Sequence, residues 1–528
     1  MEKRQKRHDL IGIGCGILVL LILIAGVIVN NLPDKAGVKD SELPVEALTL
    51  TGTAPGRNGD VTVRVVATED KLWQIEVTDH AETDGYGSLA ARDLPVSIFQ
   101  NQSLDVDVVS GATISSEAII DAIINALNEG GFDPAVFGAA SIKAETVAKK
   151  VETATGVAMM YSADWAEQYP EIYASWEQNR ENSEVTDYLV DYPMLKTLYE
   201  PFGFSKDYMS AHGHVYTLHD IGETKRVGEK TKASCFTCKT PEFTHMVNEE
   251  GAAAYAIPFA ELKDQLSEPI SCYNCHANTP GTVTVTHTYL TDGVGEDFEK
   301  IDANNLACGQ CHVEYYFDAA NSGATALPHS DLESMEPEAI LAFFNDGSNF
   351  PDGEPFADFT NPRTGVRQIK VQHPELETYL AEGSKHRDTY TCADCHMGET
   401  KAESGKTIPN HYLTSPLNNE ALIEGECAQC HVDLVGEVRE KQAEVDRRTY
   451  ATGYQLEYLT EMLAEAVASG EYTEDELNAI RSLARDAQFY WDYVFVENSE
   501  GAHNSQLTHE CLDKAEALCN EALGLFKR

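Results

Sequence analysis

Ten of the 13 cysteines in this chain form five C-x-x-C pairs, all between Cys235 and Cys430. In four pairs a histidine follows the second cysteine directly. This is the pattern of c-type haem attachment, in which two thiols bond to one macrocycle and the next side chain binds its iron. Zinc ribbons and redox dithiols, the competing interpretations, need no histidine there. The pattern predicts five haem c groups. The five units are CFTCK (Cys235, Cys238, Lys239), CYNCH (Cys272, Cys275, His276), CGQCH (Cys308, Cys311, His312), CADCH (Cys392, Cys395, His396) and CAQCH (Cys427, Cys430, His431).

One unit differs from the others because Lys239 stands where the histidine is expected. A primary amine can bind iron only when it is deprotonated, and it donates only σ density. One haem of the five is therefore chemically unlike the rest. We predict that substrate chemistry occurs at this haem and that the other four transfer electrons.

The segments around these units read as helical. From Trp165 onward, aromatic-rich helical patches alternate with long polar loops, and few strands are evident. A long charged helix is expected from Val432 to Ala468, broken by Gly470. The sequence Thr473-Glu474-Asp475-Glu476 is a capping box that should begin the next helix. Cys511 and Cys519 should be buried free thiols, because one helix would hold them roughly 12 Å apart.

A smaller domain of mixed type precedes the haem units. Valines at 61, 63 and 65 alternate with polar residues, as do the apolar residues at 73, 75 and 77, so paired strands are expected, joined by a TEDK turn. Helical periodicity begins at Ser115 and ends at Gly130 and Gly131. The chain divides into a tail and membrane helix (1–30), a linker (31–43), a small α+β domain (44–135), a connector (136–160) and the haem domain (161–528).

The amino-terminal segment predicts export. Four basic residues lie among the first nine, and an apolar run from Leu10 to Val29 follows. About 20 apolar residues suffice to span a bilayer, and the basic flank should stay in the cytoplasm. A cleaved signal peptide is the alternative. We expect a single-pass protein of the cell membrane with its catalytic part on the extracytoplasmic side. The net charge of −47 excludes nucleic acid as a partner.

At CFTCK, CGQCHVEYYF and KVQHPE the chain resembles the pentahaem, ammonia-forming cytochrome c nitrite reductases. The resemblance runs from about Trp165 to the C-terminus and includes AEQYPEIYASWE, GHVYTLHD and EGAHN. It implies six-electron reduction of nitrite to ammonia at the haem ligated by Lys239. It also implies that Arg226 holds the anionic substrate, and that Tyr315 and His373 donate hydrogen bonds and protons.

The same resemblance implies a calcium site and four distal haem ligands. Calcium would bind the Glu314 carboxylate, the Gln372 side-chain oxygen and the backbone carbonyls of Tyr315 and Lys370, which are all hard oxygen donors. A homodimer built on the long C-terminal helices is also implied. The distal ligands would be His214 for the CGQCH haem, His411 for CYNCH, His386 for CAQCH and His503 for CADCH, with His509 six residues beyond the last.

The stretch from Asp107 to Thr113 matches the D-x-x-S-G-A-T pattern of FMN-binding domains. In those domains the final threonine carries FMN through a phosphoester, which here implies Thr113, with Ser110, Gly111 and Ala112 beside it. A glycine-containing turn before a helix suits a phosphate, because helix N-termini favour anions. The expected fold is a mainly α multihaem cytochrome c domain, preceded by a small α+β FMN-binding domain and one transmembrane helix.

Two classes of function remain open on the sequence. The first is a terminal reductase that receives electrons through FMN from an unidentified membrane donor. The second is a membrane-tethered flavocytochrome that passes electrons to another protein or mineral. Lys239 together with Arg226, Tyr315 and His373 favours the reductase, since a conduit needs neither an open haem nor proton donors. A reductase of hydroxylamine or sulfite is a further alternative.

Overall fold

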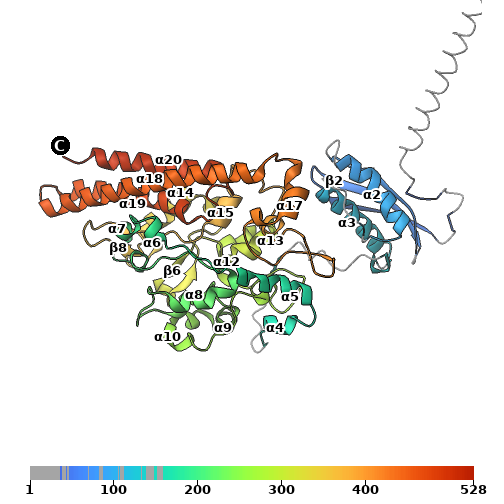
Figure 1. Ribbon diagram of the computed structural model, residues 1–528, viewed down its shortest axis with the longest axis horizontal. Coiled ribbons are helices and arrows are strands. Elements are labelled where there is room, and N and C mark those ends of the chain that lie inside the picture. The colour runs from blue at the N-terminus through green and yellow to red at the C-terminus, as the bar shows by residue number, and fades with distance from the viewer. Residues whose placement is uncertain are drawn as a thin grey trace, which may run out of the picture. The chain divides into compact units, whose positions relative to one another are not determined.

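The computed structural model contains two compact units, residues 1–142 and 143–528, shown in Figure 1. Within them the structure describes residues 36–38, 43–44, 47–68, 71–82, 87–104, 106, 112–132, 134–137, 148–151 and 158–527.

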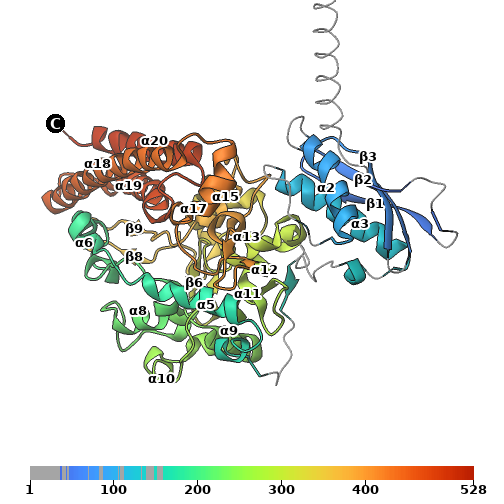
Figure 2. The ribbon, with the colours of Figure 1, turned by 45° about the vertical axis from the view of Figure 1, so that its right-hand side comes forward.

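The first unit is a three-stranded antiparallel sheet covered on one face by two helices (Figure 2). The strand order follows the sequence, so each strand pairs with its chain neighbour. Both helices share the hydrophobic core with the sheet. The elements are β1 (Leu48–Pro55), β2 (Asp60–Thr68), β3 (Lys71–Asp79), α2 (Gly87–Asn101) and α3 (Thr113–Glu129).

The alternation of apolar and polar residues along the strands directs one face of the sheet into this core. Val61, Val63 and Val65 are fully buried beneath Ile119 and Ile123 of α3. The predicted pairing of β2 with β3 is present. A register shift between Val66 and Ala67 puts Leu72 and Ile75, rather than Trp73, into the core. The helix expected from Ser115 is also present, and its cap at Gly130 matches the predicted end.

The second unit is mainly helical and carries all five C-x-x-C units. Its helices are α4 (Ser162–Trp165), α5 (Pro170–Glu177), α6 (Tyr188–Asp191), α7 (Leu195–Leu198), α8 (Thr217–Glu223), α9 (Pro241–Glu250), α10 (Phe259–Leu262), α11 (Cys272–His276), α12 (Thr288–Val294), α13 (Ala303–Gly309), α14 (Pro337–Asn345), α15 (Glu375–Leu380), α16 (Cys392–His396), α17 (Glu420–Gly425), α18 (Leu434–Ser469), α19 (Glu474–Val496) and α20 (Ser505–Gly524).

Strands in this unit are short and occur in pairs. Three pairs are antiparallel, and the pair of β4 with β5 is parallel. The paucity of strands agrees with the sequence. The strands are β4 (Lys149–Lys150), β5 (Thr284–Val285), β6 (Tyr316–Asp318), β7 (Ala324–Ala326), β8 (Phe359–Thr360), β9 (Arg367–Gln368), β10 (Thr400–Lys401) and β11 (Thr407–Ile408).

Helices α18, α19 and α20 lie side by side and form the largest core of the unit (Figures 1 and 2). Gly470 ends α18 in the left-handed conformation at φ 68°, and the predicted capping box at Thr473 begins α19. Trp491 is fully buried between the helices, and its Nε1 donates to the Thr449 carbonyl at 2.7 Å. Cys511 and Cys519 are free and buried on α20, as expected.

The prediction of a single-pass membrane protein is corrected. In the part of the chain that the structure describes, no helix is long and apolar enough to cross a bilayer. A crossing needs about 20 apolar residues, and α18, the longest described helix, is highly charged. The run from Leu10 to Val29, on which the prediction rested, lies outside the described residues, as does most of the linker at 31–43.

Gly52 on β1 provides a test of the first unit. A methyl group there would lie 2.0 Å from the Ala122 carbonyl oxygen and 2.5 Å from the Ala126 nitrogen, both on α3. Gly52→Ala should therefore push α3 off the sheet and destabilise this unit by about 1–3 kcal/mol. Hydrogen exchange of the α3 amides in the full-length protein measures the effect. Thr51→Ala, an exposed neighbour, is the control, and equal protection in both variants would contradict the packing described.

Candidate haem sites and active site

Each C-x-x-C unit lies in or beside a short helical turn. Positions i, i+3 and i+4 share one helix face, so such a turn points both sulfurs and the following side chain the same way. This is the arrangement that a covalently attached, axially ligated haem requires. The turns are Ala233–Phe236, α11, the end of α13, α16 and Cys427–Gln429.

Three of the four expected histidine pairs face each other closely. The ring centroids are 6.2 Å apart for His214 and His312, 6.2 Å for His386 and His431, and 6.1 Å for His396 and His503. Two imidazoles that each bind one metal ion at about 2 Å have centroids roughly 6 Å apart. The pairs therefore fit a shared iron.

The fourth expected pair is His276 with His411. Burial lowers the pKa of His411, and the nearby charge of His276 lowers it further. His509, the neighbour of His503, instead accepts from Arg448 Nη1 at 3.1 Å. His373 is also 6.1 Å from His312, so ring distance alone does not distinguish it from His214 as that partner.

Most of these imidazoles are fixed through Nδ1, which leaves Nε2 to face a metal. Burial lowers the pKa of His396 and of His411 to about 4, so both rings are neutral, the form that binds iron. The Nδ1 contacts are His276 to Thr282 O (2.9 Å), His396 to Thr414 O (3.0 Å), His411 to Pro409 O (3.1 Å), His431 to Glu437 Oε2 (2.9 Å) and His503 to Glu497 Oε1 (2.6 Å).

Lys239 follows the turn that carries Cys235 and Cys238. Its backbone nitrogen donates to Phe236 O at 3.0 Å, and its carbonyl accepts from Thr217 Oγ1 at 2.7 Å. The second bond ties Lys239 to the segment that supplies His214. Burial is the main cause of the low His214 pKa, and the charges of His312 and Lys239 lower it further.

Arg226 is exposed and is held from two sides. Its guanidinium lies 4.2 Å from the centroid of the Phe204 ring, and its Nε donates to Thr224 Oγ1 at 3.0 Å. Burial raises the pKa of Tyr315, and the positive charge of Arg226 offsets part of that increase. Arg226 can therefore attract an anion while remaining in electrostatic range of that tyrosine.

Tyr315 and His373 belong to two other segments. Tyr315 lies within electrostatic range of Cys238, and the His373 ring lies 6.1 Å from that of His312. Burial raises the pKa of Tyr315 well above its usual value, so the phenol keeps its proton at neutral pH. His373 Nδ1 lies 3.7 Å from Glu375 Oε1. Burial of Glu375 opposes its ionisation, but His312 and His373 outweigh burial and hold the Glu375 pKa well below its usual value.

The oxygen ligands expected for calcium also converge. Glu314 is fully buried, its Oε2 accepts from the Gln372 nitrogen at 2.6 Å, and within the described residues its Oε1 has no partner. The side-chain Nε2 of Gln372 donates a hydrogen bond to the Lys370 carbonyl at 2.8 Å. Burial raises the Glu314 pKa well above its usual value. A buried carboxylate with an unpaired oxygen fits a hard cation.

The flavin motif is only partly described. Asp107, Ser110 and Gly111 lie outside the described residues, while Ala112 is buried and precedes α3. Thr113 is the first residue of α3, and its side chain is not described. The motif thus abuts a helix N-terminus, where phosphate binds well.

Comparisons with known proteins agree with this geometry. A protein-family model described as cytochrome c552 matches residues 161–527. This chain belongs to that family. A model of the FMN-binding domain matches residues 56–128. The chain is 30% identical over 405 residues to cytochrome c nitrite reductase subunit NrfA of Nitratidesulfovibrio vulgaris strain Hildenborough, covering 68% of this chain and 76% of the relative.

A solved structure shares the fold as well. It is the catalytic subunit (NrfA) of the Desulfovibrio desulfuricans ATCC 27774 cytochrome c nitrite reductase, a structure with two calcium sites. The TM-score is 0.63 at 28% identity, covering 70% of this chain and 87% of that one. The chain is thus homologous to an oxidoreductase and is a mainly helical multihaem cytochrome c domain with an N-terminal FMN-binding domain.

In this cytochrome c552 chain, sequence reasoning missed Asp492 on α19. Its Oδ2 accepts from the Val371 nitrogen at 2.9 Å and lies 3.4 Å from the Lys370 Nζ, and its Oδ1 accepts from the Tyr199 hydroxyl. Burial lowers the Lys370 pKa and raises the Asp492 pKa. Val371 and Asp492 are 121 positions apart in the sequence, so no local pattern could have revealed the contact.

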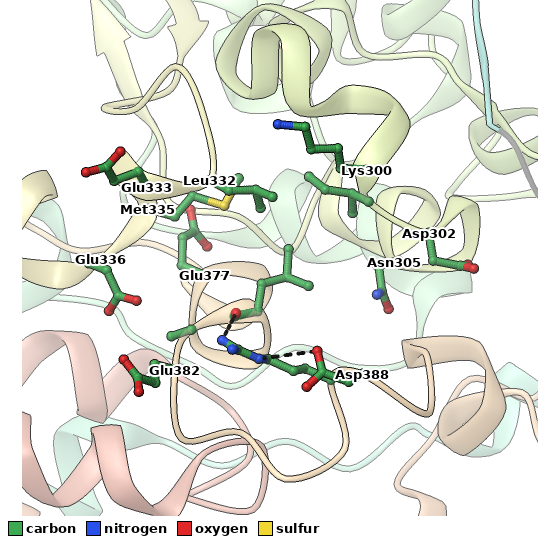
Figure 3. A pocket seen from close by; sticks show the side chains of 14 residues that line it. Lys300, Asp302, Asn305, Leu332, Glu333, Met335, Glu336, Glu377, Glu382 and Asp388 are labelled. Atoms are coloured by element: carbon green, nitrogen blue, oxygen red, sulfur yellow. Dashed lines mark hydrogen bonds and ion pairs between the residues drawn. The ribbon is translucent and has the colours of Figure 1, made fainter. Parts of the chain in front are cut away.

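Glu377 was also missed, and its side chain lines a cavity of about 600 Å³ (Figure 3). Glu377 Oε1 accepts from the Glu314 nitrogen at 2.9 Å and lies 3.0 Å from His329 Nε2. The cavity wall carries six carboxylates against Lys300 and Arg387, so it suits a cation better than an anion. Those carboxylates belong to Asp302, Glu333, Glu336, Glu377, Glu382 and Asp388.

Asp492→Asn tests how firmly α19 holds the 370–373 segment. Removing one partner of a buried ion pair should lower the free energy of unfolding by about 3–5 kcal/mol, because the Lys370 ammonium stays buried. Chemical unfolding followed by far-UV circular dichroism measures it. Asp486→Asn, on the same helix with a bond to Asn345 Nδ2 at 3.1 Å, should change stability far less. Equal losses in both variants would show that the Lys370–Asp492 pair is unimportant.

Proposed function

We propose that this protein reduces nitrite to ammonia, with six electrons, at the haem attached to Cys235 and Cys238. The observation that carries the proposal is Lys239, the only lysine among five otherwise uniform units. Tyr315, which lies within electrostatic range of Arg226, and His373, which lies beside Glu375, support it. The related nitrite reductases support the substrate. When bound, the haem supplies electrons and an open iron face; the chain supplies the ligand, the charge and the protons.

Each side chain has one task in this proposal. Lys239 Nζ would be a ligand of the haem iron. Arg226 attracts nitrite and compensates its negative charge, while Phe204 keeps the guanidinium in place. Tyr315 holds its proton at neutral pH because of burial, and so can donate it as the N–O bonds break. His373 supplies a second proton, with Glu375 available to balance its charge.

The remaining units form the proposed electron relay. Four haems would be ligated on both faces by the paired histidines, supported by the 6.1–6.2 Å ring distances in three pairs. A calcium ion at Glu314, Gln372 and the carbonyls of Tyr315 and Lys370 would compensate the unpaired Glu314 oxygen. It would also order the 370–373 segment, which carries His373.

We further propose that FMN is linked to Thr113 and passes electrons to the haems. The support is the D-x-x-S-G-A-T motif before α3 and the match of residues 56–128 to the FMN-binding domain. The proposed domain borders remain 31–43, 44–135, 136–160 and 161–528.

A homodimer is proposed on α18. This helix exposes tyrosines at positions 450, 454 and 458, a spacing of four that places them on one helix face. Three aromatic rings in a row on the exposed face of a long helix suit a partner surface, since tyrosine is enriched in interfaces.

The rival function, an electron-transfer flavocytochrome, would leave Arg226, Tyr315 and His373 without a role.

The direct test is ammonium formation from nitrite with an artificial reductant, in the intact protein and in Lys239→His. The variant should keep five haems by mass spectrometry and lose most turnover, because histidine turns the site into another relay-type haem. Lys230→His, an exposed lysine in the same loop, is the control. Tyr315→Phe and His373→Ala should each slow turnover by roughly 10²–10⁴-fold without haem loss.

Unchanged turnover in Lys239→His would refute the assignment of the catalytic haem. Ammonium formed from hydroxylamine but not from nitrite, or reduction of sulfite alone, would instead support the alternative substrates. No reduction of any of the three would support the conduit.

Thr113→Ala should abolish bound FMN while leaving nitrite reduction by a small artificial donor intact. Thr113 is the acceptor hydroxyl of the motif, and the four proposed catalytic side chains belong to the second unit. Flavin fluorescence on a denaturing gel reports attachment. Thr49→Ala, an exposed threonine of β1, should retain the flavin. Fluorescence that survives in Thr113→Ala would place the attachment elsewhere.

A further inference from the structure

Three groups of side chains in the described residues could hold a metal ion. One contains Cys238 and Cys311, which belong to haem units, and another contains His312 and His373, which belong to the proposed active site. The third, formed by His212, His219 and Asp220, contains no residue used above.

The three donors of this cluster converge on one point. Asp220 Oδ1 lies 2.6 Å from His212 Nδ1 and 3.3 Å from His219 Nδ1, and all three ligand atoms lie within 4.8 Å of one another. The His212 and His219 rings are 5.9 Å apart and nearly perpendicular, at 86°. Donor atoms around one tetrahedral zinc ion are roughly 3.3 Å apart, so small movements would accommodate an ion.

Local structure fixes this arrangement. His219 and Asp220 are consecutive on α8, and the His212 backbone nitrogen donates to Asp220 Oδ2 at 3.1 Å. The Tyr216 ring lies against His212, with centroids 5.1 Å apart. The His219 side chain is 62% exposed, against 18% for His212 and 25% for Asp220. An ion can therefore reach the cluster from solvent without any opening of the fold.

We propose that His212, His219 and Asp220 bind a transition-metal dication of the zinc class. Two imidazoles and one carboxylate select zinc-like ions over calcium or magnesium, which prefer all-oxygen sites. Three protein ligands leave a fourth position for water or an external ligand. The net charge of −47 concentrates dications near the surface and favours occupancy.

A metal ion at this site would affect the segment from His212 to Asp220, which contains an expected haem ligand. His214 lies between the ligands in sequence, and Thr217 donates to the Lys239 carbonyl at 2.7 Å. An ion bound to His212 and to α8 would join the two ends of this short segment. It would thereby restrain the backbone that presents both groups.

The test is equilibrium dialysis of the intact, haem-loaded protein against micromolar ZnCl₂ with excess calcium, which keeps zinc from any calcium site. Bound zinc is counted by mass spectrometry. We expect one more zinc ion per chain in the unmodified protein than in His219→Ala or Asp220→Asn, and at least about tenfold weaker binding in each variant. His245→Ala is the control, because His245 faces a single carboxylate, Glu249, at 3.7 Å.

Equal zinc content in the unmodified protein and both variants would overturn the proposal, as would an equal loss in His245→Ala. His219→Ala removes a mostly exposed side chain, so folding should persist, and the Soret spectrum checks this. The readout is metal content, which does not depend on nitrite reduction.

Discussion

The carboxylate of Asp492 is the contact on which the proposed active site depends most. It lies on α19, within the largest core of the molecule, and it binds both the Val371 nitrogen and the Lys370 side chain. The next two residues along the chain are Gln372 and His373. A charge buried this deeply is stable only with its partners in place, so the contact holds the 370–373 segment on the helical core.

A second chain of buried contacts extends from the same segment. Glu314 accepts from Gln372, and its own nitrogen donates to Glu377, which also meets His329. These residues follow the CGQCH unit or precede CADCH, so the contacts link two haem units to the segment of His373. Glu314 and Glu377 each keep one oxygen without a protein partner within the described residues. Such oxygens are suited to a cation, which the acidic cavity beside Glu377 would also attract.

The second unit builds much of its site from very short helices. Many have four to seven residues, too few to be stable by themselves. Haems attached through the cysteine pairs, as proposed, would stabilise such segments, because each would supply apolar surface for them to pack against. The first unit needs no such support, since its sheet and two helices share a closed hydrophobic core. The two units are thus stabilised differently: the first by its own core, and the second, in this proposal, also by bound haem.

The sequence alone determined what local patterns encode. Cysteine spacing predicted the haem units, strand alternation at 61–65 predicted the buried sheet face, and the cap at Thr473 predicted the start of α19. Its prediction of a membrane-spanning protein found no support in the described helices. Tertiary structure alone decided which distant side chains meet: Asp492 with Lys370, and Glu377 with Glu314. Periodicity and motif spacing act within one element, whereas these contacts depend on how separate elements pack, and a single sequence contains no short-range signal for that.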